Sequence, residues 1–200
     1  MKIYAVADIH GSQYRMNILL KNVERYSPDI VVICGDITQF GPGDVAKNFL
    51  NQINVETVAV TGNIDSEDVK KSIDDSNATR IELKKVVKKG IKFVGANGTK
   101  DSDFDFLRKK ELVDSDSVVV THVPPKGMQD KISIGIKGGN KIFRKIVDDF
   151  KPRLVLCGHV HENPGFTKND DTIVVNCSMG NRGEGALIDI NKSINVEMLD

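Results

Sequence analysis

The sequence predicts an α/β protein with one mixed β-sheet or two stacked sheets, and with helices packed outside. Short β-branched runs alternate with segments whose apolar residues recur about every three to four positions. Several of the strand-like runs are apolar throughout, which is typical of strands covered on both faces. Near the end of the chain, strand-like runs are joined by short polar or Gly-rich links, which indicates antiparallel neighbours.

The elements follow in chain order. A first strand is predicted at 2–7, and continuous apolar strands are predicted at 30–34, 56–61, 117–121 and 153–157. Helical periodicity is present at 16–26, 44–51, 67–75 and 140–150. A turn at 88–90 predicts a hairpin between strands at 86–87 and 91–94. The last three strands are expected to form an antiparallel meander, at 172–176, 185–190 and 193–199.

The composition bounds the class of protein. With 200 residues, 40% of them hydrophobic, the chain is expected to be a single domain spanning 1–200. Lys plus Arg and Asp plus Glu number 28 each, so an anionic ligand must be attracted locally rather than by an overall field. No apolar run approaches a membrane span and the strand-like start shows no signal peptide, so a cytoplasmic protein without membrane contact is expected. Cys34, Cys157 and Cys177 lack CxxC spacing and predict small buried side chains, not disulfides or a thiolate zinc site.

Every histidine follows a predicted strand, and acidic or amide residues follow other strands in the same way. Residues two apart can point to the same side of an extended chain, and strand ends meet along one edge of a sheet. We therefore expect seven side chains to converge on one rim: Asp8, His10, Asp36, Asn63, His122, His159 and His161.

These seven side chains predict a metal centre. Mixed imidazole and carboxylate ligands favour manganese, iron, zinc or nickel over calcium, which prefers oxygen ligands alone. The set is too large for one tetrahedral ion but suits two divalent ions bridged by a carboxylate, for which Asp36 is the candidate. Taken singly, a histidine is usually structural, Asp36 could serve a turn, and Asn63 could cap the helix that begins after Asp65. Their joint arrangement favours the metal site.

The motifs resemble those of the calcineurin-like metallophosphoesterases. Five blocks carry the resemblance, in one order between Asp8 and His161: Asp8-x-His10, Gly35-Asp36, Gly62-Asn63, His122 and Gly158-His159-x-His161. Within that family the chain looks most like small prokaryotic Icc-related phosphoesterases, through 121–127 and 158–162. The resemblance implies two stacked mixed β-sheets flanked by helices.

The resemblance also implies a ligand set and an activity. One ion would be held by Asp8, His10, Asp36 and His161, and the second by Asp36, Asn63, His122 and His159. The implied function is hydrolysis of a small phosphoester, preferentially a phosphodiester, by a metal-bridging hydroxide, with Asn63 contacting both metal and phosphate. A phosphodiester is preferred because the resemblance is to phosphodiesterases and the sequence shows no strong cationic clamp for a monoester dianion.

One departure from the family pattern concerns the leaving group. Many members continue the third block as Gly-Asn-His, whereas this chain has Ile64, so the usual leaving-group histidine is missing and the general acid is unassigned. Asp65 is not promoted to that role, and helix capping is its expected one.

Three other segments have both a functional and a structural interpretation. The Gly-rich segment 135–140 either offers amides to a phosphate or forms a connection with Asn140 as N-cap, and the connection is favoured. Residues 124–131 form either a site wall carrying Lys126 and Lys131 or a stiff surface loop. The lysines of 84–92 are expected to guard an exposed strand edge.

Two other functions remain open at this stage. The first is a non-catalytic interaction scaffold, as in the retromer subunit that shares the fold, although the intact ligand set weighs against it. The second is a nuclease, which would need a basic groove, so nucleic acid is not favoured as a partner. Homo-oligomerisation is left open.

Overall fold

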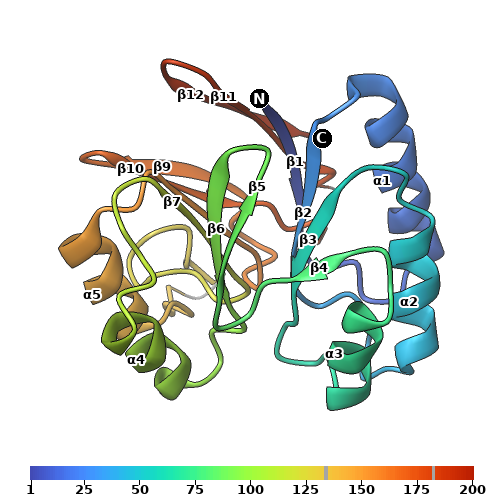
Figure 1. The fold of residues 1–200 in the computed structure, drawn as a ribbon, viewed down its shortest axis with the longest axis horizontal. Helices are drawn as coiled ribbons and strands as arrows, with labels where there is room; N and C mark the ends of the chain where they lie inside the picture. Colours follow the sequence, from blue (N-terminus) through green and yellow to red (C-terminus); the bar gives the residue numbers. More distant parts are fainter. Residues whose placement is uncertain (133–134, 182) are drawn as a thin grey trace.

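The computed structural model describes residues 1–132, 135–181 and 183–200, which form two stacked β-sheets with helices on both outer faces (Figure 1). Each sheet has six strands within this part of the chain. The strand orders are β12-β11-β1-β2-β3-β4 and β5-β6-β7-β8-β10-β9. The predicted α/β class, with two stacked mixed sheets flanked by helices, is confirmed.

The first sheet is parallel in its middle and antiparallel at one edge. β1, β2, β3 and β4 are parallel neighbours in that order. On the other side of β1, β11 pairs antiparallel with β1, and β12 pairs antiparallel with β11. β2 is buried at every position, as its uninterrupted apolar sequence predicts. The strands of this sheet are β1 (Lys2–Val6), β2 (Ile30–Cys34), β3 (Thr57–Val60), β4 (Thr79–Arg80), β11 (Gly185–Ile190) and β12 (Ile194–Leu199).

The second sheet has a parallel centre and two antiparallel edges. β6, β7, β8 and β10 are parallel neighbours, and β5 and β9 close the two ends. The β5–β6 hairpin is the one predicted from its Lys-Lys-Gly turn. The strands are β5 (Lys85–Lys88), β6 (Ile91–Ala96), β7 (Ser117–Thr121), β8 (Leu154–Cys157), β9 (Gly165–Asn169) and β10 (Thr172–Asn176).

Helices cover the outer face of each sheet (Figure 1). On the first sheet lie α1 (Gln13–Tyr26), α2 (Gly43–Asn51) and α3 (Glu67–Asp74), and on the second lie α4 (Asp101–Lys109) and α5 (Lys141–Phe150). The side chains of Ser12, Ser66 and Asn140 accept hydrogen bonds from backbone N–H groups in the first turns of α1, α3 and α5. Asn140 is therefore the predicted cap, but the prediction that Asp65 caps α3 is wrong because Ser66 does so.

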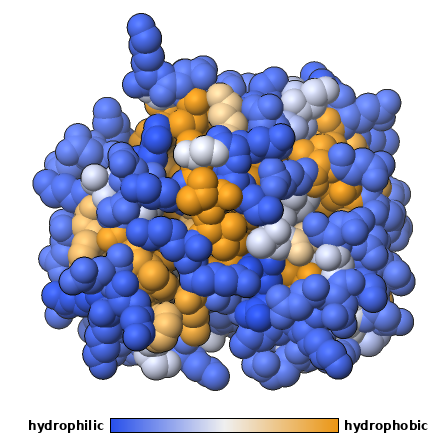
Figure 2. Space-filling view, viewed as in Figure 1, coloured by the Kyte–Doolittle hydropathy of each residue, from blue (hydrophilic) through white to orange (hydrophobic). Residues whose placement is uncertain are grey.

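The core is divided into three layers. One apolar cluster lies between the sheets and includes Ile3, Val120 and Leu156, while two others join each sheet to its helices. Cys34 and Cys177 lie in the layer between the sheets, are both buried, and have their sulfur atoms 3.8 Å apart without a disulfide. The cysteines are thus small packing residues, as predicted. The face shown in Figure 2 is mostly hydrophilic, with apolar groups gathered in its middle.

The predicted C-terminal meander is confirmed for its last two strands, which pair antiparallel, and is wrong for its first. β10 pairs with β8 and β9 in the second sheet, whereas β11 and β12 form a hairpin beside β1 in the first. The link between β10 and β11 crosses from one sheet to the other, so proximity in sequence did not indicate pairing. β4, β9 and α4 were also not predicted. No helix of the described residues has the length and apolarity needed to cross a membrane.

Candidate metal centre

Loops from both sheets bring the seven predicted side chains together. Asp8 and His10 follow β1, Asp36 follows β2, Asn63 follows β3, His122 follows β7, and His159 and His161 follow β8. Backbone hydrogen bonds join these loops, for example Asp8 N to Gly35 O at 3.1 Å and Gly158 N to His122 O at 2.9 Å. The convergence that the strand-end pattern predicts is therefore present.

Four of these residues have an unusual backbone. Asp8, His10, Asp36 and His159 have φ values of 63°, 54°, 51° and 70°, in the left-handed region that non-glycine residues rarely adopt. Such conformations cost about 1–3 kcal/mol each and are typical of functional sites held in place by their surroundings. The chain turns sharply at each strand end to present the side chain there.

Close approach of backbones requires glycine at one of these turns. Gly35, immediately before Asp36, has φ of 90°, and a Cβ there would lie 2.8 Å from the Cα of Gly62. The loops after β2 and β3 can therefore pack against each other only with glycine at this position. Their contact places the Asp36 and Asn63 side chains together.

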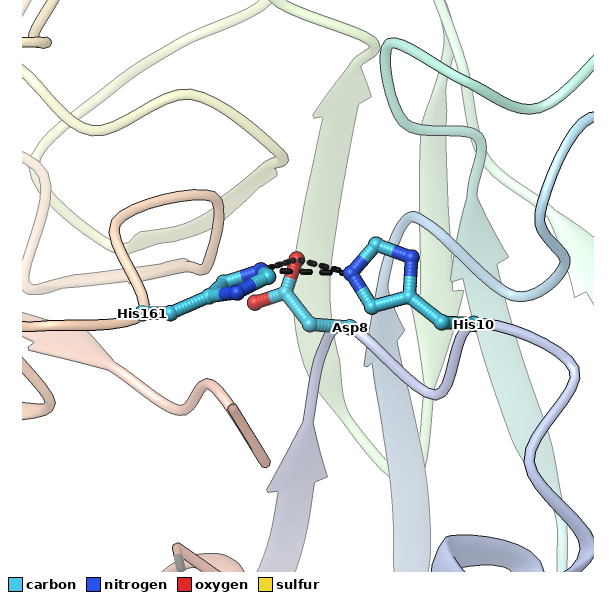
Figure 3. Close-up of side chains that lie close together, drawn as sticks. All are labelled: Asp8, His10 and His161. Atoms are coloured by element: carbon cyan, nitrogen blue, oxygen red, sulfur yellow. Dashed lines mark hydrogen bonds and ion pairs between the residues drawn. The ribbon is translucent and has the colours of Figure 1, made fainter. Parts of the chain in front are cut away.

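The first ligand group consists of Asp8, His10 and His161 (Figure 3). Asp8 Oδ1 lies between the two imidazoles, 3.2 Å from His161 Nε2 and 3.8 Å from His10 Nε2, and these two nitrogens are 3.2 Å apart. The Asp8 carboxylate is fully buried, and Oδ1 has no hydrogen-bond partner among the described residues. An orphaned buried carboxylate oxygen facing two imidazole nitrogens fits a divalent cation.

Electrostatics in this group favour an ionised carboxylate. Burial raises the pKa of Asp8, but the facing His161 imidazole, His122 and Ser178 together outweigh burial, and the pKa falls to about 2. The same contact raises the pKa of His161, whereas burial lowers the pKa of His10. Contact with Asp8 therefore favours the protonated form of His161 when no metal is bound.

The second ligand group is centred on His122, which is fully buried. His122 Nδ1 lies 2.9 Å from the carbonyl oxygen of Cys34, and because a carbonyl only accepts, Nδ1 carries the hydrogen. Nε2 then faces Asp36 Oδ2 at 3.2 Å and Asn63 Oδ1 at 2.8 Å, both of them acceptors. A neutral imidazole nitrogen surrounded by acceptors needs a cation, either a proton or a metal ion.

His159 completes this group. Its Nδ1 is 2.9 Å from Asn63 Oδ1, so the same amide oxygen faces two imidazoles. Burial lowers the pKa of His159. For His122 burial acts in the same direction, but contacts with Asp36, Asp8 and the Cys34 carbonyl together outweigh it, and the pKa is raised. Asp8, Asp36 and His122 also have ligand atoms close enough to share one ion. The two ligand groups therefore adjoin at the two aspartates.

Two residues beside the centre have roles that were not predicted from the sequence, since Arg15 was missed and Asp65 was expected to cap a helix. Arg15 Nη1 donates to the carbonyl oxygen of Asp8 at 2.7 Å, and the Asp65 carboxylate accepts backbone hydrogen bonds from the loops after β2 and β3. The signal for Arg15 was its position in the first turns of the helix after Asp8-x-His10. For Asp65 the only signal was its place next to the Asn63 loop.

Gly138 and Gly139 line a hollow beside His159, while Asn140 caps α5. Isolated β-bridges from Pro125 to Asn140 and from Lys131 to Lys137 hold the loop 124–131 in place. Lys85 and Lys92 of the β5–β6 hairpin, at the edge of the second sheet, both pair with Asp114, in agreement with the surface role predicted.

Comparison with known proteins identifies the chain's relatives. A sequence model of the family described as Calcineurin-like phosphoesterase matches residues 1–163. The uncharacterized protein MJ1162 of Methanocaldococcus jannaschii is 32% identical over 199 residues, covering 89% of this chain and 88% of its own. Two solved structures share the fold. TT1561 of Thermus thermophilus has a TM-score of 0.72 and 12% identity, and the match covers 100% of this chain and 99% of that one. An archaeal phosphodiesterase has a TM-score of 0.62 and 19% identity, and the match covers 100% of both chains.

Fold and site thus define a class, an α/β sandwich with a His, Asp and Asn centre at its strand ends. The chain belongs to the calcineurin-like phosphoesterase family. By that membership it is a metal-dependent phosphoesterase, and the resemblance drawn from its five motifs is confirmed.

Proposed function

We propose that the chain is a dinuclear phosphoesterase that preferentially hydrolyses phosphodiesters. One ion would bind Asp8, His10, Asp36 and His161, and the other Asp36, Asn63, His122 and His159. The observation that carries the proposal is the meeting of both ligand groups at the buried Asp8 and Asp36 carboxylates. Manganese, iron, zinc and nickel all suit these donors.

The protein's part in the reaction is to hold charge and geometry. A pair of divalent cations bound there would supply a hydroxide nucleophile near neutral pH and would neutralise charge on the phosphoryl oxygens. Asp36 Oδ1 accepts the backbone N–H of Ile64 at 3.2 Å, and Oδ2 faces His122. Both carboxylate oxygens are therefore fixed in direction, which keeps the ligands in a single arrangement during turnover.

Asn63 is the proposed catalytic residue of the chain. Its Oδ1 faces the imidazoles of His122 and His159, which leaves the amide nitrogen directed away from them. Among the described residues no hydrogen bond engages this NH2 group. It can therefore donate to a phosphoryl oxygen and stabilise the negative charge that develops there.

Support for a diester substrate comes from a structural neighbour, and Ile64 adds a preference for a good leaving group. Ile64 offers no proton at the position where many relatives carry histidine, which suits an ester with a good leaving group. One structure that shares the fold is titled a novel archaeal phosphodiesterase. A small-molecule ester is the proposed substrate.

Assays on the purified chain test this proposal. We expect manganese, nickel or zinc to activate hydrolysis of bis(p-nitrophenyl) phosphate, with about two ions bound per chain by elemental analysis. p-Nitrophenyl phosphate should be the poorer substrate in kcat/KM. A preference for the monoester would overturn the diester assignment, and absence of both bound metal and hydrolysis would favour an interaction scaffold instead.

A further inference from the structure

A hollow of about 550 Å³ lies directly beside the first ligand group. Its wall includes the metal-ligand candidate His10 together with Tyr14 and Arg15 from the start of α1. Sites for small ligands have volumes of about 300–1,000 Å³. A phosphoester held at His10 therefore has room next to it for one of its substituents.

Arg15 supplies the positive charge of this hollow. It is the one lysine or arginine among the lining residues that the structure describes. Its Nη1 donates to the Asp8 carbonyl oxygen at 2.7 Å, which fixes the guanidinium beside the ligand group. The ion pairs found among the described residues do not include Arg15. Since a guanidinium has five N–H donors, donors remain for a ligand.

The rest of the wall suits an organic substituent that carries a negatively charged group. Tyr14 is 75% exposed and offers a ring at the hollow, and Ile18 and Met179 contribute hydrocarbon. The other charged residue of the wall, Glu184, has its Oε2 engaged by Asn22 at 3.0 Å. Arg15 is thus the charged group of the described wall that has no partner side chain. Because the chain carries no net charge, attraction of an anion must be local.

We propose that this hollow binds the substituent that stays on phosphorus, and that Arg15 binds a carboxylate or phosphate group on that substituent. This inference rests on the proposed function and deepens it. The substrate class it names is a phosphodiester whose retained substituent carries a further anionic group. Arginine suits either anion because its planar fork can donate two parallel hydrogen bonds.

A matched pair of substrates tests the subsite. Phenyl p-nitrophenyl phosphate and 3-carboxyphenyl p-nitrophenyl phosphate share a leaving group and differ by one carboxylate. With the manganese-loaded protein we expect kcat/KM about tenfold higher for the carboxylated ester, as one charge-assisted hydrogen bond provides. Arg15→Gln should remove this advantage and Arg15→Lys should restore part of it.

A control variant removes the same charge elsewhere on the same helix. Arg25 lies in the last turn of α1, over the Tyr26 ring, ten residues along and about 15 Å from Arg15 by helical rise. Arg25→Gln should keep the full preference for the carboxylated ester. If Arg25→Gln loses the preference as Arg15→Gln does, general charge and not the subsite explains it, and the inference is overturned.

Binding without turnover separates this inference from the proposed function. Calorimetry on the manganese-loaded protein should show 3-carboxyphenylphosphonate binding about tenfold tighter than phenylphosphonate, with the difference lost in Arg15→Gln. A 3-phosphonophenyl analogue tells whether phosphate is preferred to carboxylate. Tight, Arg15-dependent binding without any hydrolysis supports the subsite while the proposed function fails. Equal binding of both phosphonates, or an equal loss for both in Arg15→Gln, overturns the subsite and leaves Arg15 as a support for Asp8.

Discussion

The carboxylate of Asp65 ties Thr38 in the loop after β2 to the loop after β3. Asp65 Oδ1 accepts hydrogen bonds from Thr38 N at 2.9 Å and Thr38 Oγ1 at 3.1 Å. Its Oδ2 accepts from the backbone N–H groups of Ile37 and Gly62, at 3.0 Å each. One side chain thus fixes the residues that directly follow Asp36 and directly precede Asn63.

Asp65→Asn should therefore damage the centre without touching a proposed ligand. An amide replaces one carboxylate oxygen by an NH2 donor, which then faces backbone N–H donors. We expect a loss of about 2–3 kcal/mol in the free energy of unfolding, since buried donors are left unpaired. Urea unfolding measures this loss. Asp116→Asn, at an exposed acid, is the control and should change stability by less than about 0.5 kcal/mol.

The ligand cluster was predictable from sequence because parallel strands put their carboxyl ends along one edge. Asp8 and Asp36 follow buried parallel strands of the first sheet, so their convergence depends only on strand polarity. His122 follows a strand of the second sheet, so its approach also depends on how the two sheets stack. Arg15 and Asp65 were not predictable in the same way. Each acts through a backbone group of another loop, and no spacing rule encodes such a contact.

The parts of the fold that were missed have physical reasons as well. Alternating or apolar runs indicate a strand but not its partner, so β10 and β11 were placed in one sheet although they lie in two. α4 buries only Phe104 and Leu107 along a highly charged sequence, which left little periodic signal. β4 has two residues and is too short for any pattern.

Asp36→Asn tests the proposed bridge. An amide cannot supply the negative charge that two cations share, and its NH2 group would face either His122 or the Ile64 N–H. We expect elemental analysis to show loss of both metals. We expect kcat/KM to fall by more than about a hundredfold, which exceeds the loss usually caused by removing a residue that only contacts a metal ligand. Dinuclear occupancy at the wild-type level would refute the bridge.

Metal binding should release protons from two of the four histidines. The pKa values of His161 and His122 are raised by contact with Asp8 and Asp36, whereas burial lowers those of His10 and His159. Protonated His161 and His122 therefore stabilise the metal-free fold below the ordinary pKa of about 6.5, and this contribution is lost as pH rises through their raised values.

Two measurements test these raised pKa values. Near pH 6, calorimetry in buffers of different ionisation enthalpy should report about two protons released when the metals bind. The rise in Tm on adding manganese should grow from pH 6 to pH 8, and activity should fall in acid. A proton count near zero at pH 6, or a flat activity profile below pH 6 in folded protein, would contradict the assignment.

The last prediction concerns the leaving group and Ile64. The backbone of this residue is held on both sides, by its N–H to Asp36 Oδ1 at 3.2 Å and by its carbonyl to Phe40 N at 3.2 Å, so its hydrocarbon side chain stays beside Asn63. That side chain can neither donate a proton to a departing oxygen nor stabilise its charge. General-acid assistance is commonly worth about a hundredfold to ten-thousandfold, so rates without it should depend steeply on leaving-group acidity.

A series of phenyl aryl phosphates whose leaving phenols increase in acidity measures that dependence, with an alkyl phenyl phosphate as the slow extreme. Ile64→His should flatten the slope by supplying a proton, and Ile64→Val, which keeps a hydrocarbon, should leave it unchanged. Metal content must be measured for each variant, because repacking at position 64 can displace Asn63. If wild-type chemical steps are equally fast for aryl and alkyl leaving groups, another group supplies the proton and this role of Ile64 is wrong.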